Sequence, residues 1–246
     1  MPHADHGEII RVSGPIIVAR NLRAATMYEV VEVSDLRLVG EVVRIVGDRA
    51  TIQVYENTSL VRPGDPVYRT GGPLSVKLGP GLIGNIYDGI QRPLRALQDH
   101  SGAFIRRGEK VPALDSAKKW HFVPTAKAGE PLRPGAVLGT VDESSAVVHR
   151  VLAPADVRTP AKLSSIVKEG DYTVDETIAH VEQSDGTPRP VSMAQIWPVR
   201  NPRPVAGRMP ADKPLITGQR VIDTLFPIAK GGSAAIPGGF GTGKTM

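Results

Sequence analysis

A glycine-rich motif near the end of the sequence, Gly-x4-Gly-Lys-Thr at residues 238–245, constrains the fold of this chain more than any other feature. Glycines in this pattern allow successive backbone N–H groups to turn inward around a chain of phosphates. The lysine can reach the β- and γ-phosphates, and the threonine hydroxyl is a ligand for Mg²⁺. We therefore predict a phosphate-binding loop, which requires a strand before it and a helix after it.

The predicted nucleotide site consists of the loop residues themselves. They are Gly238, Gly239, Phe240, Gly241, Thr242, Gly243, Lys244 and Thr245. We assign the catalytic charge to Lys244 and the metal ligand to Thr245, with ATP or ADP and Mg²⁺ as the bound groups. The small apolar residues 233–236 predict the buried strand, which Pro237 ends. A glycine-rich surface turn that happens to precede a lysine is the alternative interpretation.

The residues around the loop resemble a known family. The stretch at residues 214–232, PLITGQRVIDTLFPIAKGG, followed by GFGTGKT, is similar to the catalytic A subunit of V-type and A-type rotary ATPases. Rotary and secretion ATPases share the Thr-Gly-x-Arg-x-Ile-Asp pattern within it. Phe240 and the Phe-Pro-Ile-Ala-Lys-Gly-Gly lead-in favour the A subunit. The resemblance is specific at residues 214–245 and extends over residues 7–102, whereas at residues 110–190 it consists in the presence of an insertion.

The resemblance implies a protein that hydrolyses or synthesises ATP and couples this to proton or sodium transport. It implies B subunits in an alternating A3B3 ring, central and peripheral stalk subunits, and a membrane rotor sector as an indirect partner. The location would be cytoplasmic, on the membrane face, through the assembled complex. The family's catalytic glutamate, Mg²⁺-site aspartate and adenine pocket fall beyond residue 246. We therefore expect an N-terminal portion truncated at the loop and inactive alone.

The bulk composition indicates a globular protein, is compatible with several folded domains and excludes several other classes of protein. The chain has 246 residues, 41% of them hydrophobic and 22% charged, which is typical of globular proteins. It has no cysteine, which excludes disulfides and cysteine-based zinc sites. It also lacks an 18-residue apolar run and a signal-peptide pattern. The net charge of +5 is dispersed and aromatic residues make up 4%, so we expect no nucleic-acid partner.

Four segments follow from the patterning. Residues 1–72 predict an antiparallel β-barrel, because residues 9–18, 28–33, 39–46 and 50–55 are strand-like and separated by turn signals. Residues 73–109 predict a linker with a helix at 88–98, in which Ile90, Leu94 and Leu97 share a face and Pro93 lies in the first turn. Residues 110–195 predict a β-rich insertion, the bulge or non-homologous region that the resemblance implies. Residues 196–246 predict the start of an α/β phosphate-loop domain.

Turn chemistry and capping refine this outline. Arg62-Pro63-Gly64 and Arg133-Pro134-Gly135 predict turns in which glycine takes a positive φ. Thr217 is predicted to cap a short helix whose apolar face faces a core. The residues of that face are Val221, Ile222, Leu225 and Phe226. We interpret Asp223 as solvated or locally hydrogen-bonded, not catalytic.

No other catalytic group emerges from the sequence. The acidic pairs at residues 142–143 and 175–176 fall in the β-rich insertion, and the serine pairs at 144–145 and 164–165 lack a nucleophile elbow. His3 and His6 have a spacing that binds metal weakly, and we interpret them as part of a terminal tail.

Three alternatives stay open at this point. One is a secretion-associated relative, although such proteins lack an insertion of this size. Another is a hexameric RNA translocase with an oligonucleotide-binding barrel, which should show stacking aromatic residues beside lysines. The third is a non-catalytic assembly fragment.

Overall fold

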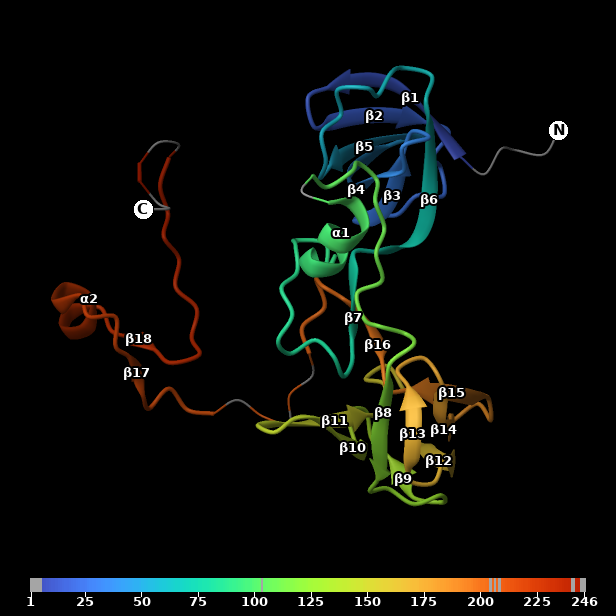
Figure 1. Cartoon of the computed structure of the whole chain (residues 1–246). Helices are drawn as coiled ribbons and strands as arrows, with labels where there is room; N and C mark the ends of the chain where they lie inside the picture. The colour runs from blue at the N-terminus through green and yellow to red at the C-terminus, as the bar shows by residue number, and fades with distance from the viewer. Residues whose placement is uncertain are drawn as a thin grey trace. The chain divides into compact units, whose positions relative to one another are not determined.

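A computed structural model describes residues 6–102, 104–203, 205, 207, 209–239 and 242–243 (Figure 1). The chain divides into two units, Met1–Arg203 and Pro204–Met246. The first unit contains a barrel, a linker and a pair of packed sheets. The second contains a short helix between two short strands and then the predicted phosphate loop.

The N-terminal strands close into an antiparallel barrel, which confirms the fold predicted for this part of the chain. Alternation of inward and outward residues produces the closure: in β5, Ala50, Ile52 and Val54 are buried and the residues between them are not. The strand order is β1-β2-β5-β4-β3-β6. The strands are β1 (His6–Ser13), β2 (Ile16–Arg20), β3 (Glu29–Val33), β4 (Leu38–Val46), β5 (Arg49–Val54) and β6 (Pro66–Pro73).

Turn residues define the ends of these strands. Gly14 has a φ of 57° between β1 and β2, and Gly47 has a φ of 63° between β4 and β5. Gly64 and Gly135 also have positive φ, at 95° and 75°. In both turns the residue after glycine donates a backbone hydrogen bond to the arginine carbonyl three positions earlier. The two predicted Pro-Gly turns are thereby confirmed.

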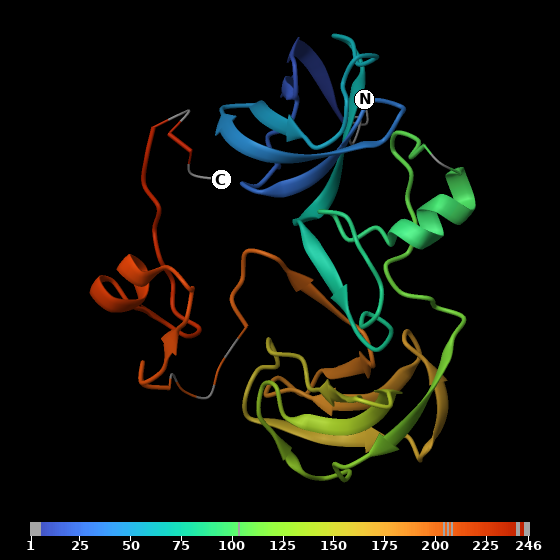
Figure 2. The same ribbon diagram turned by 60° about the vertical axis from the view of Figure 1, so that its left-hand side comes forward.

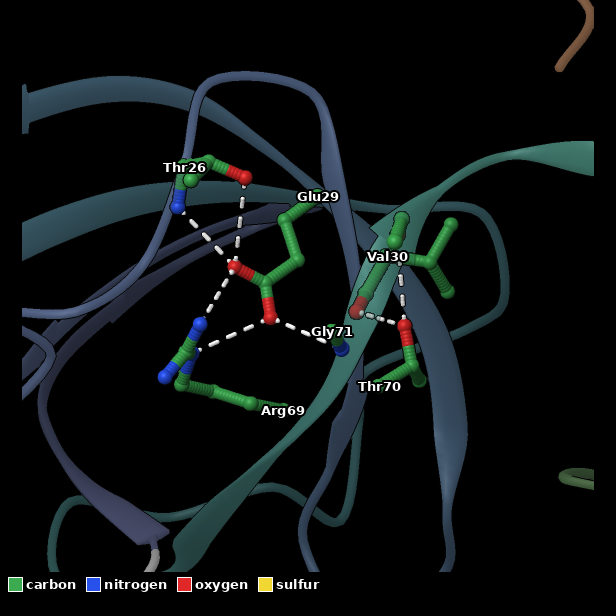
Figure 3. Close-up of polar contacts among 7 residues, drawn as sticks. Thr26, Glu29, Val30, Arg69, Thr70 and Gly71 are labelled. Carbon is green, nitrogen blue, oxygen red and sulfur yellow. Dashed lines mark hydrogen bonds and ion pairs between the residues drawn. The ribbon is translucent and has the colours of Figure 1, made fainter. Parts of the chain in front are cut away.

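A buried carboxylate stabilises the barrel near the C-terminal end of β6 (Figure 3). Glu29 accepts hydrogen bonds from the backbone N–H groups of Thr26 and Gly71, at 2.9 and 3.0 Å, and from the Arg69 guanidinium. Burial opposes ionisation of this carboxyl, but the hydrogen bonds from Thr26, Arg69 and Gly71 outweigh it and lower its pKa. Glu29 is therefore a charged structural residue inside the barrel wall.

The linker helix α1 (Leu94–Ser101) begins later than predicted. Residues 88–92 form a turn instead, because the Asp88 carboxylate accepts hydrogen bonds from the backbone N–H groups of Ile90 and Arg92. Gln91 has a φ of 63°, and Pro93 disfavours helical conformation in the residue before it. The prediction was wrong for Ile90, which lies outside the helix. Leu97 is buried, as its predicted position in the apolar face requires.

Two four-stranded antiparallel sheets form the second half of the first unit, in the strand orders β11-β10-β8-β13 and β15-β14-β12-β9 (Figure 2). One hydrophobic cluster contains Phe122 and Val141, and another contains Leu163 and Val181. This confirms a β-rich domain after the linker. The strands are β8 (Lys119–Pro124), β9 (Pro131–Leu132), β10 (Val137–Ser144), β11 (Val147–Leu152), β12 (Ala161–Ile166), β13 (Gly170–Thr173), β14 (Thr177–Glu182) and β15 (Pro188–Ser192).

A two-stranded ribbon pairs the segment that follows the barrel with the segment that follows the packed sheets. Strand β7 (Ser75–Leu78) follows the barrel, and β16 (Gln195–Pro198) follows the packed sheets. They pair antiparallel, with Trp197 opposite Val76. The returning chain is thus extended, in agreement with its proline-rich sequence.

Candidate nucleotide-binding site

The segment that precedes the predicted phosphate loop forms a small folded element of its own. Strand β17 (Pro214–Leu215) pairs antiparallel with β18 (Ile228–Ala229), and helix α2 (Arg220–Leu225) lies between them in the sequence. The backbone N–H of Lys230 donates to the Lys213 carbonyl at 2.8 Å, which extends the pairing by one step. This pairing brings residue 230 back to residue 213, and the chain then continues toward the predicted phosphate loop.

Asp223 holds the turn before α2 in place. Its carboxylate accepts hydrogen bonds from the Thr217 N–H and hydroxyl, at 3.0 and 2.7 Å, and from the Gly218 N–H at 3.0 Å. The Thr217 hydrogen bonds come first among the causes that lower the pKa of this exposed carboxyl. The prediction that Asp223 is locally bonded is confirmed. The Thr-Gly-x-Arg-x-Ile-Asp pattern therefore has a local explanation, because its first two residues donate to its last.

Two predictions about this segment were wrong. The first residue of α2 follows Gln219, and Thr217 is not its N-cap, although the Thr217 hydroxyl accepts a hydrogen bond from the Gln219 N–H. The apolar face of α2 does not face a core: Val221, Leu225 and Phe226 are exposed. Short amphipathic helices are stabilised chiefly by packing, and no described residue of this unit covers that face.

The strand predicted at residues 233–236 is not formed in the structure. These residues are in no strand, and Ile236 is 73% exposed. A strand needs a neighbour to satisfy its backbone groups, and none of the described strands pairs with this segment. The apolar residues 233–236 predict a buried strand, and no described part of the structure covers them.

The structure describes part of the predicted phosphate loop. Gly238, Gly239, Thr242 and Gly243 are exposed, and the Thr242 hydroxyl donates to the Gly239 carbonyl at 2.8 Å. Gly243 has a φ of 73°, and no heavy atom lies within 4 Å of the position a Cβ would take there. The backbone at Gly243 is thus in a conformation that glycine favours, on an open surface.

The other loop residues lie outside the described part of the structure. They are Phe240, Gly241, Lys244 and Thr245. The assigned catalytic charge, Lys244, and the assigned Mg²⁺ ligand, Thr245, are among them, so both assignments stay predictions. Within the described ranges no three histidine or acidic side chains are grouped as a metal site requires.

At least one residue of each acidic pair in the β-rich domain has structural partners. Glu143 accepts hydrogen bonds from the backbone N–H groups of Gly81 and Ile83, which fastens the loop after β7 to strand β10. Asp175 bonds to Lys77 and Ser116. These contacts agree with the interpretation that neither pair is catalytic. No helix in the described parts of the chain is long and apolar enough to cross a bilayer.

Comparison with known proteins extends this picture. Residues 9–71 match the family model described as the ATP synthase alpha/beta family, beta-barrel domain. Residues 111–200 match the ATP synthase alpha/beta subunit barrel-sandwich domain. The chain therefore belongs to the ATP synthase alpha/beta family.

The most similar relatives are all of one subunit type. The chain is 54% identical over 243 residues to the A subunit of the A-type ATP synthase of Saccharolobus solfataricus, and 53% identical over 240 residues to that of Pyrococcus horikoshii. Both alignments cover 98% of this chain. They span 40% and 25% of the relatives' own lengths. The predicted resemblance to A subunits is confirmed over the residues that the chain shares with them.

Proposed function

We propose that this chain is the nucleotide-binding part of a catalytic A subunit in a proton- or sodium-translocating rotary ATPase or ATP synthase. The observation that carries the proposal is the Gly-x4-Gly-Lys-Thr motif at residues 238–245, in a sequence 54% identical to the A subunit of an A-type ATP synthase. The hydrogen bonds from Thr217 and Gly218 to Asp223 support it, because they give the family pattern before the loop a structural role.

In this proposal the loop backbone from Gly238 to Gly243 surrounds the phosphates of ATP or ADP with N–H donors. Lys244 neutralises charge on the β- and γ-phosphates, and the Thr245 hydroxyl is a ligand of Mg²⁺, which supplies further charge neutralisation when it is bound. The positive φ of Gly243 supports this arrangement, since glycine there lets backbone approach phosphate. Residues 1–246 alone are proposed to be inactive, because the family's catalytic acids would lie beyond them.

The partners and the domain boundaries belong to the same proposal. They are B subunits in an alternating A3B3 ring, central and peripheral stalks, and indirectly a membrane rotor sector, with the protein at the cytoplasmic membrane face. Residues 1–72 would form the barrel, 73–109 the linker, 110–195 the inserted β-rich domain, and 196–246 the beginning of the phosphate-loop domain.

An RNA-translocating ATPase is the alternative from another class. Its barrel should offer free aromatic rings for base stacking. The tyrosines of this barrel are engaged otherwise: Arg200 lies over the Tyr28 ring, Arg37 lies over the Tyr68 ring, and the Tyr55 hydroxyl bonds to Glu41. These contacts favour a barrel used for packing and assembly.

The test is the ATPase activity of reconstituted catalytic rings in which every full-length A subunit carries Lys244→Ala. We expect a loss of at least about a hundredfold, because removing one group that stabilises transition-state charge has effects of this order. The exposed Lys213→Ala is the control for loss of a lysine from the same unit. Near-normal turnover of the Lys244→Ala ring would mean that the chemistry lies elsewhere in the complex.

A further inference from the structure

The last residues of the first unit are folded back on themselves. In residues 197–203, here called the exit turn, the Trp197 indole N–H donates to the Asn201 carbonyl at 2.7 Å, and Asn201 N–H donates to the Pro198 carbonyl at 3.0 Å. The Arg203 guanidinium stacks over the Trp197 ring at 4.4 Å. Val199 N–H donates to the Leu74 carbonyl at 2.9 Å, which continues the β7–β16 pairing into the turn. The exit turn is therefore a defined structure and not a loose linker.

Arg200 connects the exit turn to the barrel. Its Nε donates to Glu41 Oε1 at 3.1 Å, and a terminal nitrogen donates to Glu41 Oε2 at 2.6 Å. Such a two-pronged contact is the strongest geometry for an arginine–carboxylate pair. Glu41 lies on β4, and its side chain is 5% exposed. The Tyr55 hydroxyl, just after β5, donates to the same carboxylate at 3.0 Å.

Tyr28 is a further barrel residue in contact with Arg200, and its backbone has an unfavourable conformation. Its ring lies under the guanidinium, 4.2 Å from ring centroid to Cζ, which is a cation–π geometry. Tyr28 has a φ of 66°, a left-handed conformation that is rare for a bulky side chain. A hydrogen bond from its N–H to the Val42 carbonyl, at 2.9 Å, holds it there. Strained backbone of this kind is found where surrounding structure gains from it.

The contact should be either fully made or fully broken. Without Arg200, the nearly buried Glu41 carboxylate would keep Tyr55 as its donor but lose its counter-charge. An uncompensated charge in such a place is strongly unfavourable, so intermediate positions of Arg200 gain little. Glu41, Tyr55 and Tyr28 come from different parts of the barrel, and Arg200 lies 159 residues after Glu41 in the sequence. The contact therefore closes a long loop of chain.

We propose that Arg200 is a latch that fastens the exit turn to the barrel and fixes the point where the chain leaves the first unit for the phosphate-loop unit. In the closed state the exit turn, the β7–β16 ribbon and the barrel are one body. In the open state the exit turn is released and Val199 loses its protection. The latch does not depend on nucleotide chemistry, and its failure would leave the proposed ATPase function untouched.

Amide hydrogen exchange in the 246-residue chain tests the latch directly. We expect Arg200→Gln to lower the protection of the Val199 amide at least tenfold, with the amide of the barrel residue Ile52 unchanged. Arg200→Lys keeps the charge but loses the two-pronged geometry, and should give an intermediate loss. The control is Arg203→Gln, which removes a guanidinium from the same turn that stacks on Trp197. Protection of Val199 within twofold of wild type in Arg200→Gln would overturn the proposal.

A double-variant cycle separates the latch from a general loosening of the barrel. Glu41→Gln alone should also release Val199, and combining it with Arg200→Gln should add little, because both changes break one contact. Tyr28→Phe keeps the ring and should leave Val199 protected. Losses at Glu41 and Arg200 that multiply in the double variant would mean that the two residues act separately, which contradicts a latch. If Glu41→Gln lowers Ile52 protection as well, that variant loosens the barrel itself. The comparison of Arg200→Lys with Arg203→Gln then tests the latch.

Discussion

The fully buried Glu29 of β3 and Arg69 of β6 form a two-pronged ion pair across the barrel wall, with nitrogen–oxygen distances of 3.0 and 3.2 Å. The pair lies where the register between the two strands shifts: Val31 pairs with Arg69, but Glu29 pairs with Pro73. The Glu29 carboxylate accepts the Gly71 N–H at this bulge. A side chain thus supplies the hydrogen bond that the interrupted ladder does not, and it does so where the chain leaves the barrel.

Glu29→Gln should therefore destabilise the barrel by about 3 kcal/mol, the effect expected when one partner of a buried ion pair is removed. The matched control is Glu8→Gln. Glu8 also pairs with an arginine, Arg20, but both side chains are well exposed. That change should stay within about 0.5 kcal/mol. Urea unfolding of the two variants measures both, and similar effects would show that burial of Glu29 does not matter.

Acid should destabilise the first unit through the same carboxylate. Burial opposes ionisation of Glu29, yet its hydrogen bonds lower its pKa below the ordinary value of 4.5. A lowered pKa means that the folded state binds the proton more weakly than the unfolded chain. The stabilisation is therefore present above pH 4.5 and is lost as the pH falls through the folded-state pKa.

The measurement is the urea midpoint of wild type and Glu29→Gln between pH 7 and pH 3. The wild type should lose stability below about pH 4.5 more steeply than the variant, which has no carboxyl to protonate there. Other carboxyls with lowered pKa, such as Asp88, keep a smaller slope in the variant. Identical slopes would contradict the assignment to Glu29.

Two histidines of the β-rich domain should titrate on opposite sides of pH 6.5. The ring of His121 contacts Asp171 at 2.9 Å and Glu169 at 3.1 Å, and the hydrogen bond to Asp171 is the main cause that raises its pKa. Burial lowers the pKa of His149. Stabilisation from His121 is full below pH 6.5 and is lost as the pH rises through its folded-state pKa, whereas that from His149 is lost as the pH falls. NMR titration of the ring protons checks this, and a His121 midpoint below that of His149 would refute it.

Gly139→Ala should disrupt the core of the packed sheets. A Cβ at Gly139 would lie 2.4 Å from a ring carbon of the fully buried Phe122 and 2.6 Å from the Val123 carbonyl oxygen. Overpacking of this kind typically destabilises by about 1–3 kcal/mol. Gly72→Ala is the control, because a Cβ there meets no heavy atom within 4 Å. Thermal unfolding of both variants is the measurement, and a tolerated Gly139→Ala would show that strand β10 can move away from β8.

The sequence was informative where local patterning and tertiary packing agree. In β3 the alternation of Glu29, Val31 and Val33 places all three on one face, and all three are buried. The inward position of Glu29 could therefore have been predicted from the period of two. Its partner could not, because Arg69 lies 40 residues away and no local rule links the two. The same holds for Arg200 and Glu41.

The failed predictions have two physical causes: local patterns do not specify what packs against an element, and local side-chain hydrogen bonds compete with helix formation. Val221, Leu225 and Phe226 form an apolar face, but no described residue of their unit covers it. Before α1, hydrogen bonds from backbone N–H groups to the Asp88 side chain stabilise a turn in place of the predicted first helical residues. The candidate site is predicted from its motif alone, because a phosphate loop depends on backbone geometry that its glycines encode.

Gly243→Val should abolish nucleotide binding by the full-length protein. Gly243 has a φ of 73°, which a β-branched residue strongly disfavours, and a side chain there would occupy the space through which backbone approaches phosphate. Gly186→Val is the matched control: Gly186 has a φ of 77° and equally open surroundings, but it lies in the turn between β14 and β15. Titration with a fluorescent ATP analogue and Mg²⁺ should show no saturable binding for Gly243→Val and wild-type affinity for Gly186→Val. Unchanged affinity in Gly243→Val would mean that residues 238–245 do not hold the phosphates.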